Sequence, residues 1–155
     1  MIRVQKEDFD VGKEIDGLAP GNTSVGGVAC FIGVVRDFVG DDKETGTAVG
    51  AITLEHYPGM TEQKLTAIEA EARQRWPLDG CLIIHRYGRL ELGDRIVMVA
   101  TAAAHRSDAL DACQFLIDWL KTEAPFWKLE ETETGGHWVD ARAGDDHRAA
   151  RWIKK

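Results

Sequence analysis

HRSDALDACQFLIDWLKTEAPFWK, residues 105–128, is the stretch that says most about the fold of this chain. Ser107 is a good N-cap, and we predict a helix from there to about Thr122, because Pro125 prevents much continuation. Apolar residues cover most of its circumference, whereas a surface helix leaves a broad polar face. The helix should therefore be buried on nearly all sides, either by a second subunit that contributes to the burial or by the chain's own sheet.

The segments around this helix predict strands that come in neighbouring pairs. Asp10 can cap a short helix with Val11 and Ile15 on one face, and a longer helix is predicted over residues 60–76. Glycines at positions 26, 27 and 33 suggest a bulge or a close backbone approach in the first strand. The predicted strands cover residues 24–36, 48–57, 81–87, 95–103, 129–132 and 137–140, with 48–57 as the partner of 24–36.

The predicted order is α-β-β-α-β-β-α-β-β, without regular βαβ alternation. This order favours an α+β domain with mainly antiparallel pairing. The chain is 155 residues long, which suits one domain over residues 1–142 and a polar C-terminal tail over residues 143–155, with Trp152 as its only large apolar anchor. Residues 37–46 are polar, and we interpret them as a mobile loop.

Composition excludes several classes of function. The formal net charge of −7 argues against broad binding to nucleic acid or to an anionic membrane, although it allows a small cationic pocket. The longest apolar stretch, residues 96–104, is too short to span a bilayer. The three cysteines are far apart and form no CxxC pair, so a zinc site or a disulfide framework is not expected. The chain therefore reads as a reduced, intracellular protein without a metal.

The sequence carries no nucleotide-binding, zinc-protease or nucleophile-elbow motif. Five other residues draw attention because they lie at the ends of predicted elements, where ligand groups often occur: Arg36, His105, Arg106, Lys121 and Lys128. Each has an ordinary structural interpretation, and Lys121 in particular could pair with Asp118 at the helix end. Together they would suit an anionic small molecule. His85, in the middle of a strand, is interpreted as a packing residue.

Several separated motifs resemble the large-subunit family of molybdopterin synthase. They are GVVR at 33–36, LEHYPGM at 54–60, HRYGRLELGD at 85–94 and the whole of residues 105–128. The resemblance runs from about the N-terminal helix to about residue 142. It implies an α/β hammerhead-like fold with an additional antiparallel sheet, which agrees with the predicted strand pairs.

The resemblance also implies an activity and its partners. Members of this family transfer two sulfurs to cyclic pyranopterin monophosphate, taking them from the C-terminal Gly-Gly thiocarboxylate of a small ubiquitin-like subunit. They form a homodimer within a heterotetramer, work in the cytoplasm and need no cofactor for this step. By motif, Lys121 and Lys128 correspond to the catalytic pair. The residues implied in substrate binding are Val35, Arg36, His105, Arg106 and Glu130.

Two other functions remain open from the sequence. The chain could be a non-catalytic module that binds a ubiquitin-like partner or a pterin phosphate, although the presence of both Lys121 and Lys128 speaks against a degenerate copy. It could also be an enzyme of the same fold that acts on another phosphorylated heterocycle.

Overall fold

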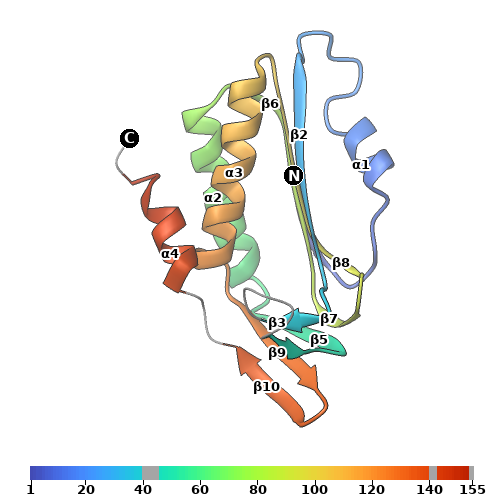
Figure 1. Ribbon diagram of the computed structural model, residues 1–155. Helices are drawn as coiled ribbons and strands as arrows, with labels where there is room; N and C mark the ends of the chain where they lie inside the picture. Colours follow the sequence, from blue (N-terminus) through green and yellow to red (C-terminus); the bar gives the residue numbers. More distant parts are fainter. Residues whose placement is uncertain (40–45, 140–142, 154–155) are drawn as a thin grey trace.

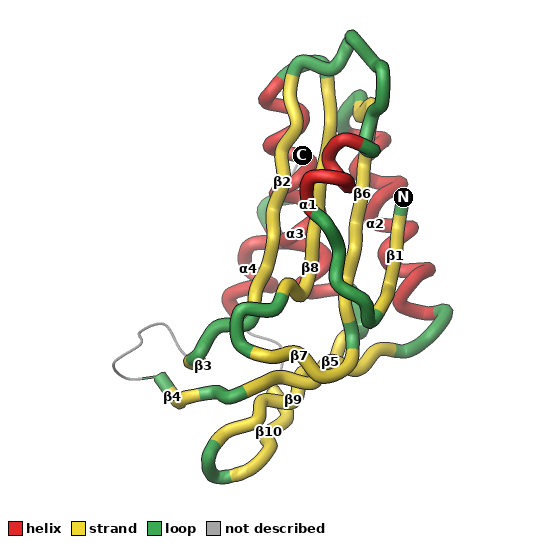
Figure 2. The backbone as a smooth tube through the Cα atoms, turned by 90° about the vertical axis from the view of Figure 1, so that its right-hand side faces the viewer, coloured by secondary structure: helices red, strands yellow, loops and turns green. Residues whose placement is uncertain are grey.

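The computed structural model describes residues 1–39, 46–139 and 143–153, and its main layer is a four-stranded sheet. The strand order is β1-β6-β8-β2, so β1 and β2 are its edges (Figure 2). Helices α2 (Met60–Arg75), α3 (Arg106–Glu123) and α4 (Ala143–Ala150) lie on one side of it and α1 (Val11–Asp16) on the other (Figure 1). The four strands are β1 (Ile2–Gln5), β6 (Leu78–Arg86), β8 (Arg95–Ala103) and β2 (Gly27–Val34).

A second, smaller sheet lies across one end of the first, where α3 also ends (Figure 1). Its order is β10-β9-β5-β7, and all three pairings are antiparallel. The strands are β10 (Gly135–Val139), β9 (Phe126–Thr132), β5 (Ala51–His56) and β7 (Gly88–Glu91). A short ladder joins β3 (Phe38–Val39) to β4 (Thr47–Ala48). Two open sheets with packed helices confirm the predicted α+β class with an additional antiparallel sheet.

The strand partners differ in part from the prediction. Pairing between 81–87 and 95–103 is confirmed by β6 and β8, and the terminal hairpin by β9 and β10. Pairing between 24–36 and 48–57 was wrong: β2 pairs with β8, and β5 pairs with β7 and β9. Sequence neighbours were assumed to be spatial neighbours, but the chain leaves the main sheet after β2. The expected mobility of residues 37–46 concerns mainly residues 40–45, which lie outside the described residues.

Glycines at both ends of β2 permit the close approaches that the sequence suggested. A Cβ on Gly26 would lie 2.2 Å from the carbonyl oxygen of Ala104, which no side chain could tolerate. At the other end, the β2–β8 register shifts between Gly33 and Val34, which marks a bulge. The predicted close approach is confirmed, and the register places the extra residue of the bulge, Ile96, on β8 opposite the step from Gly33 to Val34.

Helix α3 is the core of the fold, and the chain itself covers it. The sheet strands β2 and β8 lie against one side of α3, and α2 and α4 flank it (Figure 1). Ala112, Phe115 and Leu116 are completely enclosed, whereas Leu110 is 60% exposed. Of the two explanations that the sequence left open, burial by the chain's own elements therefore accounts for the apolar circumference. The helix begins at Arg106 with His105 as its cap, so the predicted Ser107 cap was wrong, whereas the Asp10 cap of α1 is confirmed.

The segment predicted as a polar tail contains α4 and ends on a buried polar cluster. The carboxylate of Asp118 on α3 is 3% exposed and accepts hydrogen bonds from the Trp152 indole at 2.8 Å and from Arg151 at 2.7 Å. The Trp152 ring packs edge-on against Trp76 and Phe115, with centroids 5.7 and 5.6 Å away. Residues 151 and 152 are thus fastened to α3, while the expected domain boundary at residue 142 lies outside the described residues.

Candidate active site

A cavity of about 590 Å³ opens where the C-terminal end of α3 meets the end of β2 and the inner face of the small sheet. Five of the seven residues predicted for the site line it, which are Val35, Arg36, Lys121, Lys128 and Glu130. Apolar side chains from both sheets and from α3 make most of the remaining wall, including Phe31, Ile52, Leu54, Ile117, Phe126 and Val139. The segment after β2 thus meets α3 and β9, which are consecutive elements much later in the chain, and together they bring most of the predicted residues to one cavity.

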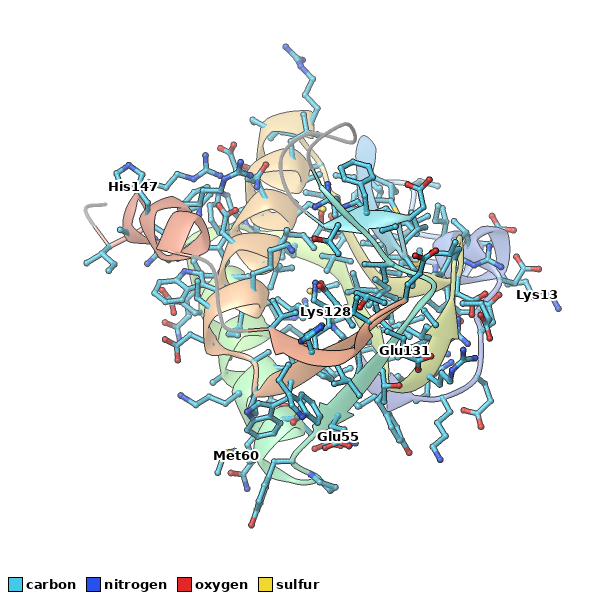
Figure 3. All side chains as sticks on the ribbon, turned by 60° about the horizontal axis from the view of Figure 1, so that its bottom comes forward. Lys13, Glu55, Met60, Lys128, Glu131 and His147 are labelled. Atoms are coloured by element: carbon cyan, nitrogen blue, oxygen red, sulfur yellow. The ribbon has the colours of Figure 1, made fainter. Side chains whose placement is uncertain are left out.

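Strand alternation aims the β9 residues into this cavity. Phe126, Lys128 and Glu130 are spaced by two, so they share one face of β9, and all three line the cavity. The Lys128 ammonium lies 2.6 Å from the carboxylate of Glu130, which is only 8% exposed. In Figure 3 Lys128 lies on the side of β9 that faces α3, whereas Glu55 lies on the opposite side of the small sheet. The pair leaves Lys128 accessible from the cavity while Glu130 fixes its position.

The segment that follows β2 brings Arg36 to the cavity. Val35 is buried, and its backbone binds the turn before β8, donating to Asp94 O at 2.9 Å and accepting from Gly93 N at 2.8 Å. This anchoring fixes the backbone just before Arg36. The Arg36 guanidinium lies over the Phe38 ring, 4.9 Å from its centroid, in a cation–π contact. Arg36 is therefore held at the cavity wall with its side chain exposed.

Lys121 lies in the last turn of α3 and lines the cavity together with Ile117 and Leu120. The structure does not contain the ion pair between Lys121 and Asp118 that the sequence allowed. The Asp118 carboxylate instead accepts hydrogen bonds from Gln114, Arg151 and Trp152 on the α4 side. Lys121 therefore lines the cavity and does not pair with Asp118 at the end of the helix.

His105 and Arg106 do not reach this cavity within one chain. They lie at the N-terminal end of α3, and at 1.5 Å per residue Arg106 is roughly 22 Å along the helix axis from Lys121. Both are exposed, next to the start of β2, where a Cβ on Gly27 would lie 3.6 Å from the Arg106 Cα. The five cationic and titratable residues were expected to converge on one pocket, completed if necessary by a second subunit. A single chain does not bring all five together, because α3 separates His105 and Arg106 from Lys121 by its length, so the shared pocket stays a prediction for a dimer.

His85 is a cavity residue that the sequence interpretation missed. It lies on β6, is 5% exposed and stacks on Phe126 with ring centroids 3.6 Å apart. Burial lowers the pKa of His85 to about 4, and the positive charge of Lys121 acts in the same direction. The period of two in residues 81–87 could have indicated its place, because Cys81 and Ile83 on the same face pack in the core beneath α3.

The charge distribution of the cavity is opposite to that of the chain. Its charged wall residues are Arg36, Lys121 and Lys128 against the single carboxylate of Glu130, in a protein of net charge −7. Such a wall attracts an anionic ligand. Within the described residues, no group of three or more His, Cys, Asp or Glu side chains could hold a metal, and no helix there is long and apolar enough to cross a membrane.

Comparison with known proteins gives one consistent family. The model of the MoaE protein family matches residues 4–123. Proteins named molybdopterin synthase catalytic subunit from Ralstonia nicotianae and Pseudomonas aeruginosa are each 52% identical over 151 residues, covering 97% of this chain and 83% and 97% of their own lengths.

Solved structures agree with the sequence relatives. The molybdopterin biosynthesis MoaE protein from Burkholderia ambifaria superposes with a TM-score of 0.82 at 51% identity, covering 100% of this chain and 99% of that one. Molybdopterin synthase from Staphylococcus aureus gives 0.79 at 29% identity, with 89% and 96% coverage. With matching sequence and fold, this chain belongs to the MoaE protein family, together with relatives named as catalytic subunits of molybdopterin synthase.

Proposed function

We propose that this chain is the catalytic subunit of a molybdopterin synthase. It adds two sulfurs to cyclic pyranopterin monophosphate, each taken from the C-terminal thiocarboxylate of a small ubiquitin-like subunit. The observation that carries the proposal is a cationic cavity, lined by Lys121, Lys128 and Arg36, in a chain about half identical to proteins of that name. In this proposal the protein works in the cytoplasm, and the sulfur arrives already activated on its partner.

Each cavity residue has a role in this chemistry. Sulfur transfer from a thiocarboxylate creates negative charge and moves protons, and Lys121 and Lys128 are placed to stabilise that charge and to exchange protons. Glu130 holds Lys128 through their 2.6 Å ion pair. Arg36 offers fixed guanidinium donors that match phosphate oxygens. Val35 forms part of the apolar wall that shields the site from water.

We further propose that His105 and Arg106 complete this cavity from a second copy of the chain. Strand β2 is an edge of the main sheet with an exposed backbone side, and Val28, Phe31 and Val34 along it are 39–50% exposed. An open apolar edge of this kind is a template for another strand. Antiparallel pairing of two β2 strands would set the start of one beside the end of the other.

This pairing would bring together the two groups of predicted site residues, which lie at opposite ends of α3 in a single chain. The start of β2 lies next to Arg106, and the end of β2 leads to Arg36. Antiparallel pairing would therefore bring Arg106 of one copy toward the cavity of the other. The eight residues of β2 span roughly 27 Å at 3.4 Å per residue, comparable to the separation along α3. The dimer would then supply phosphate donors that a single chain lacks.

The small sheet offers a surface for the sulfur-carrying partner. Val139 lines the cavity from β10, which is one edge strand of that sheet, with β7 at the opposite edge. The neighbouring Trp138 and Trp127 are 57% and 48% exposed on the outer face. An extended Gly-Gly tail entering past β10 would place its carboxyl end among the cations, while the partner's body covers the two tryptophans. Two partner subunits on one dimer would make a heterotetramer.

The direct test incubates the chain with cyclic pyranopterin monophosphate and a thiocarboxylated small subunit, and measures molybdopterin. Formation of molybdopterin that depends on the thiocarboxylate supports the proposal. Binding of both components without product would instead identify a non-catalytic module, and failure to bind the pterin would point to another phosphorylated heterocycle.

The assembly is tested separately by light scattering. Val28→Lys puts a charge on the exposed edge of β2, away from the cavity of its own chain, and should shift the chain from dimer to monomer. Met60→Lys is the matched control, because Met60 is 48% exposed at the start of α2, a helix whose strand contacts are mainly with β1 and β6. A wild-type chain that is monomeric at micromolar concentration, or a Val28→Lys variant that remains dimeric, would contradict pairing through β2.

A further inference from the structure

His85 has a feature that the proposed chemistry has not used, which is a hydrogen-bond acceptor inside a cationic cavity. Its Nδ1 lies 2.9 Å from the backbone oxygen of Arg86. A carbonyl oxygen can only accept, so Nδ1 carries the hydrogen and Nε2 of the neutral ring is an acceptor. Among the described residues, none donates to Nε2, and this atom is not one of the completely enclosed polar atoms without a partner. Because His85 lines the cavity, Nε2 is open to it.

The surroundings keep this acceptor in place and uncharged. The ring is stacked on Phe126, with planes 16° from parallel, and the Nδ1 contact fixes its rotation. Burial is the main reason that the pKa of His85 falls to about 4, and positive charge from Lys121 on α3 and from His56 on β5 adds to it. From β9, Lys128 and its partner Glu130 face the same cavity. At neutral pH the ring therefore accepts a hydrogen bond and does not compete with the lysines as a cation.

We propose that His85 is a positioning residue for Lys121: when the flexible Lys121 side chain turns into the cavity, its ammonium donates to Nε2 of His85 the hydrogen bond that this atom lacks in the structure. The inference rests on the proposed function, because it takes Lys121 as a catalytic group. The Lys121 side chain is exposed and has a flexible four-carbon stem. Its ammonium therefore needs a fixed hydrogen-bond partner to stay at one point of the cavity wall. Among the described wall residues, His85 offers such a partner in its Nε2 acceptor, whereas the Glu130 carboxylate is already engaged by Lys128. Each lysine then has its own buried anchor.

The test uses substitutions that separate the acceptor from the packing. His85→Phe keeps a ring that can stack on Phe126 but removes the acceptor, and His85→Gln offers a side-chain oxygen. We expect His85→Phe to lower kcat about 10- to 100-fold, the loss expected for a hydrogen bond to a charged group, with KM for the pterin unchanged. His85→Gln should recover much of that loss. His56→Phe is the matched control, because His56 also packs near Phe126, at 6.1 Å, but does not line the cavity, so its activity should stay at the wild-type level.

A second readout does not depend on turnover. Competitive labelling of amines with acetic anhydride, followed by mass spectrometry, reports the reactivity of each lysine in the intact chain. In His85→Phe the reactivity of Lys121 should rise while that of Lys128 stays unchanged. In a Lys121→Ala background, His85→Phe should have no further effect on kcat, because both changes remove the same interaction.

These outcomes separate the inference from the proposed function. A wild-type chain without synthase activity overturns the proposed function, while the labelling experiment still tests the His85–Lys121 contact. An active wild type with unchanged kcat in His85→Phe, or an unchanged Lys121 reactivity, overturns the positioning role alone. An equal loss of kcat in the presence and absence of Lys121 would also overturn it, since His85 would then act only on the structure.

Discussion

Trp152→Ala should destabilise the chain strongly, although Trp152 lies in a segment that the sequence describes as a polar tail. The side chain is 8% exposed, packs against Trp76 and Phe115, and donates to the buried Asp118 carboxylate. Removing a buried tryptophan side chain typically costs about 3–5 kcal/mol. Asp118 keeps its hydrogen bond from Arg151, so the loss of the indole donor adds little. Against a typical domain stability of about 5–15 kcal/mol, this is a large fraction.

Urea unfolding followed by circular dichroism measures this effect. With a denaturant slope of about 2 kcal/mol per molar, the midpoint should fall by roughly 1.5–2.5 M. Trp138→Ala is the matched control, because Trp138 is 57% exposed and its loss should change the stability by less than about 0.5 kcal/mol. A midpoint for Trp152→Ala within 0.3 M or so of the wild type would refute the reasoning, since Trp152 would then not be docked on α3 in solution.

Three further outcomes follow from the site. Lys121→Ala should reduce molybdopterin formation about 10²- to 10⁴-fold, the usual worth of positioned proton transfer, with circular dichroism unchanged; near wild-type turnover would remove Lys121 from the mechanism. A mixture of Arg106→Ala and Lys121→Ala chains should regain activity by forming one intact site per dimer, and no recovery on mixing would contradict a shared site. The pKa of His85 is about 4 in the folded chain and 6.5 in an unfolded chain, so the unfolded state binds a proton at a higher pH. The free energy of unfolding should therefore fall as the pH drops from about 6.5 to 4, by on the order of 3 kcal/mol. His85→Phe should lose that part of the pH dependence, as measured by urea midpoints.

Hydrophobic periodicity was sufficient to predict the helices and strands whose own sequence carries a strong signal. The bounds predicted for β8 are those observed, and α2 and the terminal hairpin were also found, because their apolar spacing and turn residues are local properties. The short strand β1 was missed, since four residues paired in parallel to β6 have no local partner to reveal them. Helix α4 was missed because its sequence is polar, and what anchors residues 151 and 152 is the buried Asp118 on another helix.

The candidate site was predictable only through the resemblance. Spacing alone left Lys121 and Lys128 as ordinary surface charges, and it is the crossing of α3 and β9 that brings them to one cavity. His85 was missed because a histidine in the middle of a strand more often serves packing, and its exposure to the cavity depends on the segment after β2 and on the small sheet. The separation of Arg106 from Lys121 follows from the length of α3, which the sequence does give.

The central question about this protein is whether Lys121 and Lys128 act at a sulfur-transfer site. The decisive measurement is the amount of molybdopterin formed from cyclic pyranopterin monophosphate and a thiocarboxylated small subunit, at saturating concentrations, by the wild-type chain and by Lys121→Ala. We expect rapid formation by the wild type and a loss of about 10²-fold or more in the variant, with fold and dimer intact. Equal formation by both chains, or none by the wild type with both partners bound, would contradict it.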